Sequence, residues 1–236
     1  MRAQAIRAGL HKTVQLVAPH RFKPAYIQAQ LDRLGAALYL EIGVRDGATF
    51  RSVRCRRKVA VDPTRTETMR IIRPGESFFE ETSDHFFETS VRHALADEPI
   101  DVALIDGLHQ FEQVLRDVLN CAQWIRPDGV IVLDDCNPSS AERGQSSPTG
   151  GPWNGDVWKA IALIRRTQPQ WNCITVDTDE GIGMIWGFEA GVATISESDM
   201  SWARDLKYQD LDRDRSMIGL TPALTKSELS RRARRP

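Results

Sequence analysis

The stretch Leu38-Tyr-Leu-Glu-Ile-Gly-Val-Arg-Asp-Gly-Ala-Thr-Phe50, which runs on to Val59-Ala-Val-Asp62, decides the fold of this chain. Leu38–Ile42 is a short apolar run with one acid, typical of a buried strand in a parallel sheet. Gly43 and Gly47 follow at once, then a segment able to start a helix, then a second apolar run that ends in Asp62. Glycines let backbone approach a ligand, and a carboxylate about 20 residues further on can hold a ribose diol. This order predicts a nucleotide-binding crossover.

The residues inside the turn favour one cofactor over another. A dinucleotide fingerprint requires G-x-G-x-x-G, but the middle position here is Arg45, whose side chain fits poorly against a pyrophosphate. Glu41, the acid near the end of the strand, suits a ligand that carries an ammonium group. S-adenosylmethionine (SAM) has such a group and carries no phosphate. A nicotinamide-dependent oxidoreductase is therefore the disfavoured alternative.

At this turn the sequence resembles the class I SAM-dependent methyltransferases. Residues 41–47 match the first motif of that family, with Arg45 replacing the usual middle glycine. The resemblance implies a Rossmann-like fold over about residues 35–188. It also implies that SAM is held by Glu41, Gly43, Gly47 and Asp62.

Length and composition indicate one α/β domain. A chain of 236 residues with 41% apolar and 27% charged residues is ordinary for a soluble globular protein. The net charge of −1 gives no global attraction to nucleic acid or to an anionic membrane. The four cysteines form no C-x-x-C pair, and we find neither a signal-peptide pattern nor an apolar run long enough to span a bilayer. We therefore expect a reduced, cytoplasmic setting.

Apolar runs along the chain predict a seven-stranded, mostly parallel α/β sheet that ends in an antiparallel hairpin. After the first two strands, we expect strands at 77–80, 101–106, 130–135, 173–176 and 182–186. We expect helices at 85–95 and 109–124 and one ending near Thr167, with a turn at 127–129.

The two ends of the chain lie outside this sheet. Residues 1–34 predict two short helices, broken by Pro19 and Pro24, that cover the sheet or meet a partner subunit of a homo-oligomer. Residues 189–236 form a charged extension, and its basic end at 231–235 is expected to be a solvated tail rather than a nucleic-acid contact.

Ser83 and Asp84 follow the expected third strand. In an open parallel sheet the ligand lies across the carboxyl ends of the strands. A Ser-Asp pair there can hydrogen-bond an adenine amino group and a ring nitrogen, which is also what the family resemblance implies. The alternative is that Asp84 caps the helix that starts at His85.

Three aspartates end two other strands. Asp106 ends one, and Asp134 and Asp135 end the next. Adjacent parallel strands joined by one helix place their carboxyl ends about 5 Å apart, so these carboxylates should converge beside the cofactor turn. A hard divalent cation, Mg²⁺ above all, would relieve their mutual repulsion. The alternative is that these aspartates cap helices or bond backbone.

His109 lies on the same turn as Asp106 and is a candidate general base. If the pKa of bulk water, about 15.7, stands for that of an alcohol, the pKa of an imidazole, near 6.5, is about nine units lower. Proton transfer from the alcohol to the imidazole would then cost about 12 kcal/mol. A metal that binds the hydroxyl would lower its pKa. For a phenol, near 10, the metal would be less necessary. The alternative for His109 is an ordinary helix-start residue.

The pattern Asp106-x-x-His109 with Asp134 and Asp135 resembles the metal-dependent O-methyltransferases that act on sugars of macrolide and aminocoumarin antibiotics. This resemblance implies that the three acids bind Mg²⁺, that Asp106 also lies beside the cofactor, and that His109 serves as base, as in the macrolide branch. In the aminocoumarin branch the base is an acid at the position that Leu108 occupies here.

The sequence therefore predicts a SAM-dependent, Mg²⁺-assisted O-methyltransferase acting on a hydroxyl of a sugar or related small molecule. Residues 137–155 are expected to form a lid. Trp153 and Asp156 are candidates to line the acceptor pocket, but Asp156 is better suited to cap the following helix. Two alternatives stay open. One is a metal-independent methyltransferase of a more acidic acceptor, and the other is a non-catalytic module that binds SAM or a partner.

Overall fold

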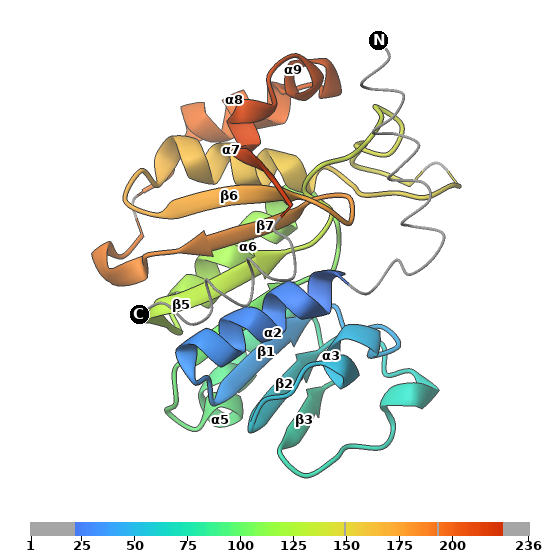
Figure 1. The fold of residues 1–236 in the computed structure, drawn as a ribbon, viewed down its shortest axis with the longest axis vertical. Helices are drawn as coiled ribbons and strands as arrows, with labels where there is room; N and C mark the ends of the chain where they lie inside the picture. The colour runs from blue at the N-terminus through green and yellow to red at the C-terminus, as the bar shows by residue number, and fades with distance from the viewer. Residues whose placement is uncertain (1–21, 149, 193, 224–236) are drawn as a thin grey trace.

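A computed structural model describes residues 22–148, 150–192 and 194–223, and its centre is one eight-stranded sheet (Figure 1). The strand order is β3-β2-β1-β4-β5-β7-β6-β8. The strands are β1 (Leu38–Ile42), β2 (Arg57–Val61), β3 (Glu76–Phe79), β4 (Ile100–Ile105), β5 (Ile125–Leu133), β6 (Asn172–Asp177), β7 (Ile182–Trp186) and β8 (Leu220–Pro222).

The sheet has the Rossmann-like arrangement that the sequence predicts. Strands β1 to β5 pair in parallel, and β7 pairs antiparallel with both β5 and β6, which confirms the closing hairpin. The expected strand number is corrected from seven to eight, because β8 pairs in parallel with β6. The strand order reverses between β1 and β4, and a ligand crevice lies outside the carboxyl ends at such a point.

Helices cover both faces of the sheet (Figure 1). Alternate residues of β1 serve the two faces: Leu38, Leu40 and Ile42 pack in one core cluster and Tyr39 in the other. The first cluster takes in α5 (Val91–Leu95), α6 (Phe111–Ala122) and α7 (Val157–Thr167). The second takes in α2 (Phe22–Leu34) and α3 (Ala48–Ser52). Helix α2 therefore lies on this face of the sheet, and its first turn reaches the carboxyl ends of β4 and β5, where Lys23 contacts Asp106 and Asp134.

The C-terminal segment adds to the same core. Helices α8 (Glu197–Asp205) and α9 (Tyr208–Arg213) bury Ala203 and Leu211 in the cluster that contains α7. The basic end expected to be a solvated tail, and the first of the two expected N-terminal helices, lie outside the described residues. Within the described ranges no helix is long and apolar enough to cross a membrane.

Two local expectations are corrected. The expected turn at 127–129 is a bulge inside β5, since Ile100 pairs with Ile125 but Val102 pairs with Val130. The helical segment that begins with α4 (Ser83–His85) is capped by Thr82, whose hydroxyl accepts from the His85 amide, and not by Asp84. It continues through a π-helical turn (Phe86–Ser90) into α5.

Candidate active site

One cavity of about 1060 Å³ opens at the carboxyl ends of the strands. Cavities of about 300–1,000 Å³ hold one drug-sized ligand, so this one has room for a cofactor with a small acceptor beside it. Of the residues singled out from the sequence, Gly47 and Asp156 lie outside its lining, so the placement of Asp156 at the acceptor is not supported, whereas Trp153 does line the cavity. Those that line it are Glu41, Gly43, Asp62, Ser83, Asp84, Asp106, His109, Asp134 and Asp135.

The glycine turn after β1 requires left-handed backbone at three positions. Gly43 has φ +81°, and a Cβ there would lie 2.2 Å from the carbonyl oxygen of Asp106, so only glycine lets β1 end this close to β4. Gly47 has φ +77° and begins α3. Arg45 stands between them with φ 51°. Arg45, which replaces the glycine usual at this position of the motif, thus adopts a left-handed conformation that glycine adopts more easily.

Asp62 fastens this turn from the end of β2. Its Oδ2 accepts hydrogen bonds from the amides of Val44 (2.9 Å) and Arg45 (2.8 Å). Its Oδ1 accepts from the amide of Thr64 at 2.8 Å. The carboxylate that the sequence assigns to the ribose therefore also holds the loop that would surround the cofactor.

Glu41 is buried under the turn. The hydroxyl of Tyr39 donates to its Oε2 at 2.7 Å. Burial raises the pKa of Glu41 to about 8, against the opposing effect of the Tyr39 hydrogen bond. A cation placed in the cavity beside Glu41 would favour the charged form of this carboxyl group.

Ser83 and Asp84 also line the cavity, as expected from their place after β3. The side-chain amide of Gln113, on α6, donates to Ser83 Oγ (3.2 Å) and to Asp84 Oδ1 (3.0 Å). The same amide reaches Asp117 Oδ1 at 3.1 Å. Gln113 was not expected from the sequence, because the periodicity of its helix indicates only packing.

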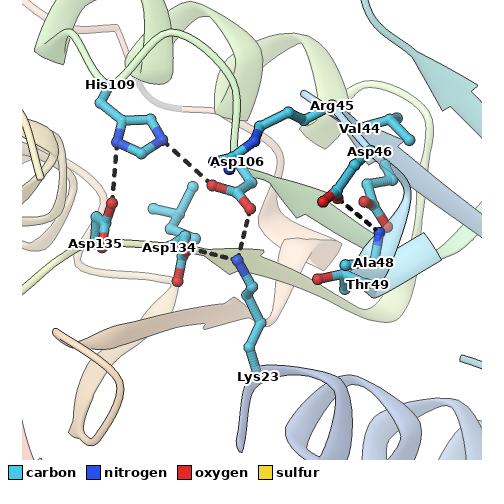
Figure 2. Close-up of polar contacts among 12 residues, drawn as sticks. Lys23, Val44, Arg45, Asp46, Ala48, Thr49, Asp106, His109, Asp134 and Asp135 are labelled. Carbon is cyan, nitrogen blue, oxygen red and sulfur yellow. Dashed lines mark hydrogen bonds and ion pairs between the residues drawn. The ribbon is translucent and has the colours of Figure 1, made fainter. Parts of the chain in front are cut away.

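The three strand-end aspartates converge as expected, but a lysine lies among them (Figure 2). Lys23 Nζ, from the first turn of α2, is 2.6 Å from Asp106 Oδ2 and 2.5 Å from Asp134 Oδ2. The lysine side chain is only 6% exposed. Burial would lower the pKa of Lys23, but the charges and hydrogen bonds of the two aspartates outweigh it and raise the pKa.

The two aspartates respond in opposite directions. Burial would raise the pKa of Asp106, but Lys23 and His109 hold it below its usual value, so Asp106 is ionised. Burial, together with the charges of Asp106 and Asp135, raises the pKa of Asp134 well above its usual value.

His109 bridges two carboxylates (Figure 2). Its Nε2 is 3.3 Å from Asp106 Oδ1 and its Nδ1 is 3.0 Å from Asp135 Oδ2. Burial would lower the pKa of His109, but the hydrogen bonds and charges of both aspartates raise it to about 10. At neutral pH the imidazole is therefore a cation that lies at ion-pair distance from both carboxylates.

The end of the loop expected to be a lid, residues 153–155, contacts His109 and its partner Asp135. Trp153 stacks on the imidazole, with ring centroids 5.6 Å apart and an interplanar angle of 19°. Asn154 Nδ2 donates to Asp135 Oδ1 at 2.7 Å. Gly155 has φ +71°, and its Cβ would lie 1.7 Å from the His109 carbonyl oxygen. The end of the loop thus fixes both the histidine and its aspartate.

Asp156 corrects an expectation of ours. It precedes α7, but its side chain makes no capping bond there. Its Oδ1 instead accepts from the amide of Phe111, at the start of α6, at 2.7 Å. Asp156 therefore joins two helix starts behind His109, and it is buried.

The arrangement does not fit a divalent metal as it stands. The facing oxygens of Asp106 and Asp134 hold an ammonium group, and both oxygens of Asp135 are bonded to His109 and Asn154. In the part of the chain that the structure describes, no group of three or more His, Cys, Asp or Glu is placed to hold a metal ion. The sequence pattern that indicated Mg²⁺ could not reveal Lys23, which lies 83 residues before Asp106 and in no motif.

Residues 40–136 of this chain match the model of a family described as a methyltransferase domain. No curated protein matches the sequence.

Several solved structures share the fold. Cofactor-bound Rv0187 from MTB has a TM-score of 0.52 and 17% identity, covering 71% of this chain and 81% of its own. TomG, an O-methyltransferase of tomaymycin synthesis from Streptomyces achromogenes in complex with SAM, has a TM-score of 0.50 and 16% identity over 69% and 78% of the two chains. MycE, a methyltransferase of the mycinamycin pathway in complex with Mg, SAH and mycinamycin VI, has a TM-score of 0.50 and 18% identity. That match covers 75% of this chain but 52% of MycE.

Proposed function

We propose that this chain is a class I, SAM-dependent methyltransferase and that it methylates a hydroxyl group of a small molecule. The observation that carries the proposal is one cavity lined at one end by the glycine turn with Asp62 and at the other by His109 between two carboxylates. The O-methyltransferase TomG and the methyltransferase MycE share the fold. A small hydroxyl acceptor, rather than nucleic acid or a membrane, and a cytoplasmic setting remain part of this proposal.

In this proposal SAM lies across the carboxyl ends of β1, β2 and β3. Asp62 faces the ribose, Ser83 and Asp84 face the adenine, and Gly43 and Gly47 shape the turn around the cofactor. Glu41 receives the ammonium group, which would favour its ionised form. Asp106, at the end of β4, borders both the cofactor and the acceptor. The support is that all of these residues except Gly47 line the same cavity.

His109 acts as the general base in its neutral form. Asp135 holds Nδ1–H at 3.0 Å and so orients the ring, as the aspartate of a catalytic triad does. The Nε2 contact to Asp106 is long, 3.3 Å, so an acceptor hydroxyl can replace it. The acceptor oxygen gives its proton to Nε2 and forms the new O–CH₃ bond as the S–CH₃ bond breaks. The electron pair of the broken bond stays on sulfur, which leaves SAH.

The raised pKa of His109 bears on which hydroxyl can react. The pKa of an alcohol, taken as about 15.7, is about six units above a pKa of about 10 for His109. Proton transfer from the alcohol to His109 would therefore cost about 8 kcal/mol. Against a phenol near 10 the shortfall disappears. A sugar hydroxyl remains one candidate acceptor on the strength of the sequence resemblance. The pKa of His109 favours the second candidate, a more acidic hydroxyl such as a phenol or enol.

The Mg²⁺ assistance that the sequence pattern led us to expect is not part of this mechanism. The acids that would bind the ion, Asp106, Asp134 and Asp135, are bonded to Lys23, His109 and Asn154 instead. The other rivals are weaker. An oxidoreductase is opposed by Arg45 and by the family match, and a purely binding module leaves the buried His109–Asp135 pair without a purpose.

The test is methyl transfer from methyl-labelled SAM to a panel of glycosides and phenols. We expect transfer to at least one acceptor class, and a loss of about 10²–10⁴-fold in kcat for His109→Gln with unchanged SAM affinity. His93→Gln, on the exposed side of α5, is the matched control and should behave as the wild type. Equal turnover by His109→Gln and wild type would remove His109 from the chemistry. No transfer to any hydroxyl, with SAM bound, would favour the binding module.

A further inference from the structure

Lys23 occupies the place between the strand ends where a cation is needed. The ammonium lies between the carboxyl ends of β4 and β5, within 2.6 Å of both Asp106 Oδ2 and Asp134 Oδ2 (Figure 2). The side chain is buried, and it lines the cavity. It comes from α2, on the opposite side of the sheet from α6, which carries the His109 turn into the site.

A buried lysine is retained only where its charge is matched. The ionised Asp106 and the carboxyl group of Asp134 lie at ion-pair distance from it here, and the ammonium reduces the repulsion that the convergence of Asp106 and Asp134 creates. A divalent ion in the same place would relieve the same repulsion. The sequence contains the acids for that ion but also provides, from its N-terminal region, a cation of its own.

A divalent ion and the Lys23 ammonium cannot share these oxygens. Mg²⁺ requires oxygen ligands at about 2.0–2.1 Å in octahedral geometry. The Nζ already lies 2.5 Å from Asp134 Oδ2, so an ion bound there would touch the ammonium, and two cations in contact repel strongly. Asp135, the third acid, is turned away toward His109 and Asn154.

We propose that Lys23 is the resident cation of this site, that it excludes divalent metal from Asp106 and Asp134, and that methyl transfer in this protein is metal-independent. This inference deepens the proposed function and rests on it for the reaction alone. Lys23 acts as a positioning residue: it holds the two aspartates in place so that Asp106 Oδ1 stays beside His109. The acceptor class that follows is a hydroxyl acidic enough to react without a metal, a phenol or an enol.

The test measures metal binding, which does not require the acceptor. MgCl₂ and MnCl₂ are titrated by calorimetry into the full-length wild type, Lys23→Met and Lys58→Met, each after chelation. Lys58 is the matched control, since it is also buried and paired with a carboxylate, Glu76, at 3.0 Å, but lies outside the cavity. We expect Lys23→Met to bind Mn²⁺ or Mg²⁺ at least tenfold more tightly than the wild type, and Lys58→Met to match the wild type.

Two results would overturn the proposal. One is wild-type binding of either metal as tight as that of Lys23→Met, and the other is the failure of folded Lys23→Met to gain binding. If Lys23→Met does not fold, the wild type decides: submillimolar metal binding that Asp134→Asn abolishes contradicts the proposal, and its absence supports it. SAM is titrated into the same samples. Lost SAM binding would count against the proposed function, whereas the metal data count for or against Lys23 alone.

Discussion

Replacing Gly43 by alanine tests the geometry of the cofactor turn. The new Cβ would lie 2.2 Å from the carbonyl oxygen of Asp106 and 2.4 Å from the Cα of Gly107, which are backbone atoms that cannot rotate away. The left-handed backbone adds strain of about 1–2 kcal/mol, and overpacking adds about 1–3 kcal/mol. Reduced freedom of the unfolded chain returns about 0.4–1 kcal/mol. We expect Gly43→Ala to lower the free energy of unfolding by about 1–5 kcal/mol.

Gly35→Ala is the matched control. Gly35 also has a positive φ, +58°, but a Cβ there meets nothing within 4 Å. It carries the strain without the clash, so we expect a loss of about 1 kcal/mol or less. For a chain of this size, about 1 kcal/mol shifts Tm by about 2–4 °C, and thermal unfolding followed by circular dichroism resolves the difference. Equal Tm values for the two variants would refute the claim that Gly43 is required by the close approach of β1 and β4.

Three further predictions concern the acids and the histidine. Asp101→Ala removes a buried acceptor of two backbone amides and of Arg126, and should lower the free energy of unfolding, measured by urea titration, by about 3 kcal/mol. The control Asp128→Ala removes an exposed partner of Arg126 and should lower it by less than about 1 kcal/mol. Equal losses in the two variants would contradict this prediction. The methyl-transfer rate should rise with pH above 7, with a midpoint at or below about 10, because only neutral His109 accepts a proton. The positive charge of bound SAM lowers the pKa of His109 and so moves the midpoint down. A rate that falls over this pH range would exclude His109 as the base. Trp153→Ala should reduce kcat more than Trp153→Phe, which keeps a ring on His109, and identical rates would show that the stacking is unimportant.

The pH dependence of stability follows from the same histidine. The pKa of His109 in the folded protein is raised from its usual 6.5 to about 10, so its ion pairs stabilise the protein fully below pH 6.5. That contribution is lost as the pH rises through about 10. Thermal unfolding at pH 6 and pH 10 should show a smaller Tm difference in His109→Gln than in the wild type. An unchanged difference would mean that His109 does not titrate in this way.

The sheet was predictable because its signal is local. Each strand of a buried parallel sheet is a continuous apolar run, and turns and helix periods separate the runs, so β1 was found at its observed bounds. The eighth strand was missed because Leu220–Pro222 is short and has no apolar run of its own; its pairing with β6 creates it. The bulge in β5 was read as a turn because Pro-Asp-Gly has the same local preferences in both.

The site was predictable only where its residues end strands. Asp106 and Asp134 converge because adjacent parallel strands end together, a consequence of topology. Lys23 reaches the cavity from a helix 83 residues before Asp106, and no motif surrounds it. Gln113 lies only four residues after His109, but it belongs to a helix whose periodicity indicates packing alone. The presence of Lys23 changes the expected chemistry of the site. Three converging acids alone indicate a metal ion, whereas here the buried lysine supplies the positive charge.

Calorimetric titration of SAM into the chelated protein tests the central claim most directly. We predict that SAM and SAH both bind at one site per chain, that NAD does not bind, and that Asp62→Ala weakens SAM binding at least tenfold. Binding of NAD in place of SAM, or no SAM binding by the folded wild type, would contradict the account.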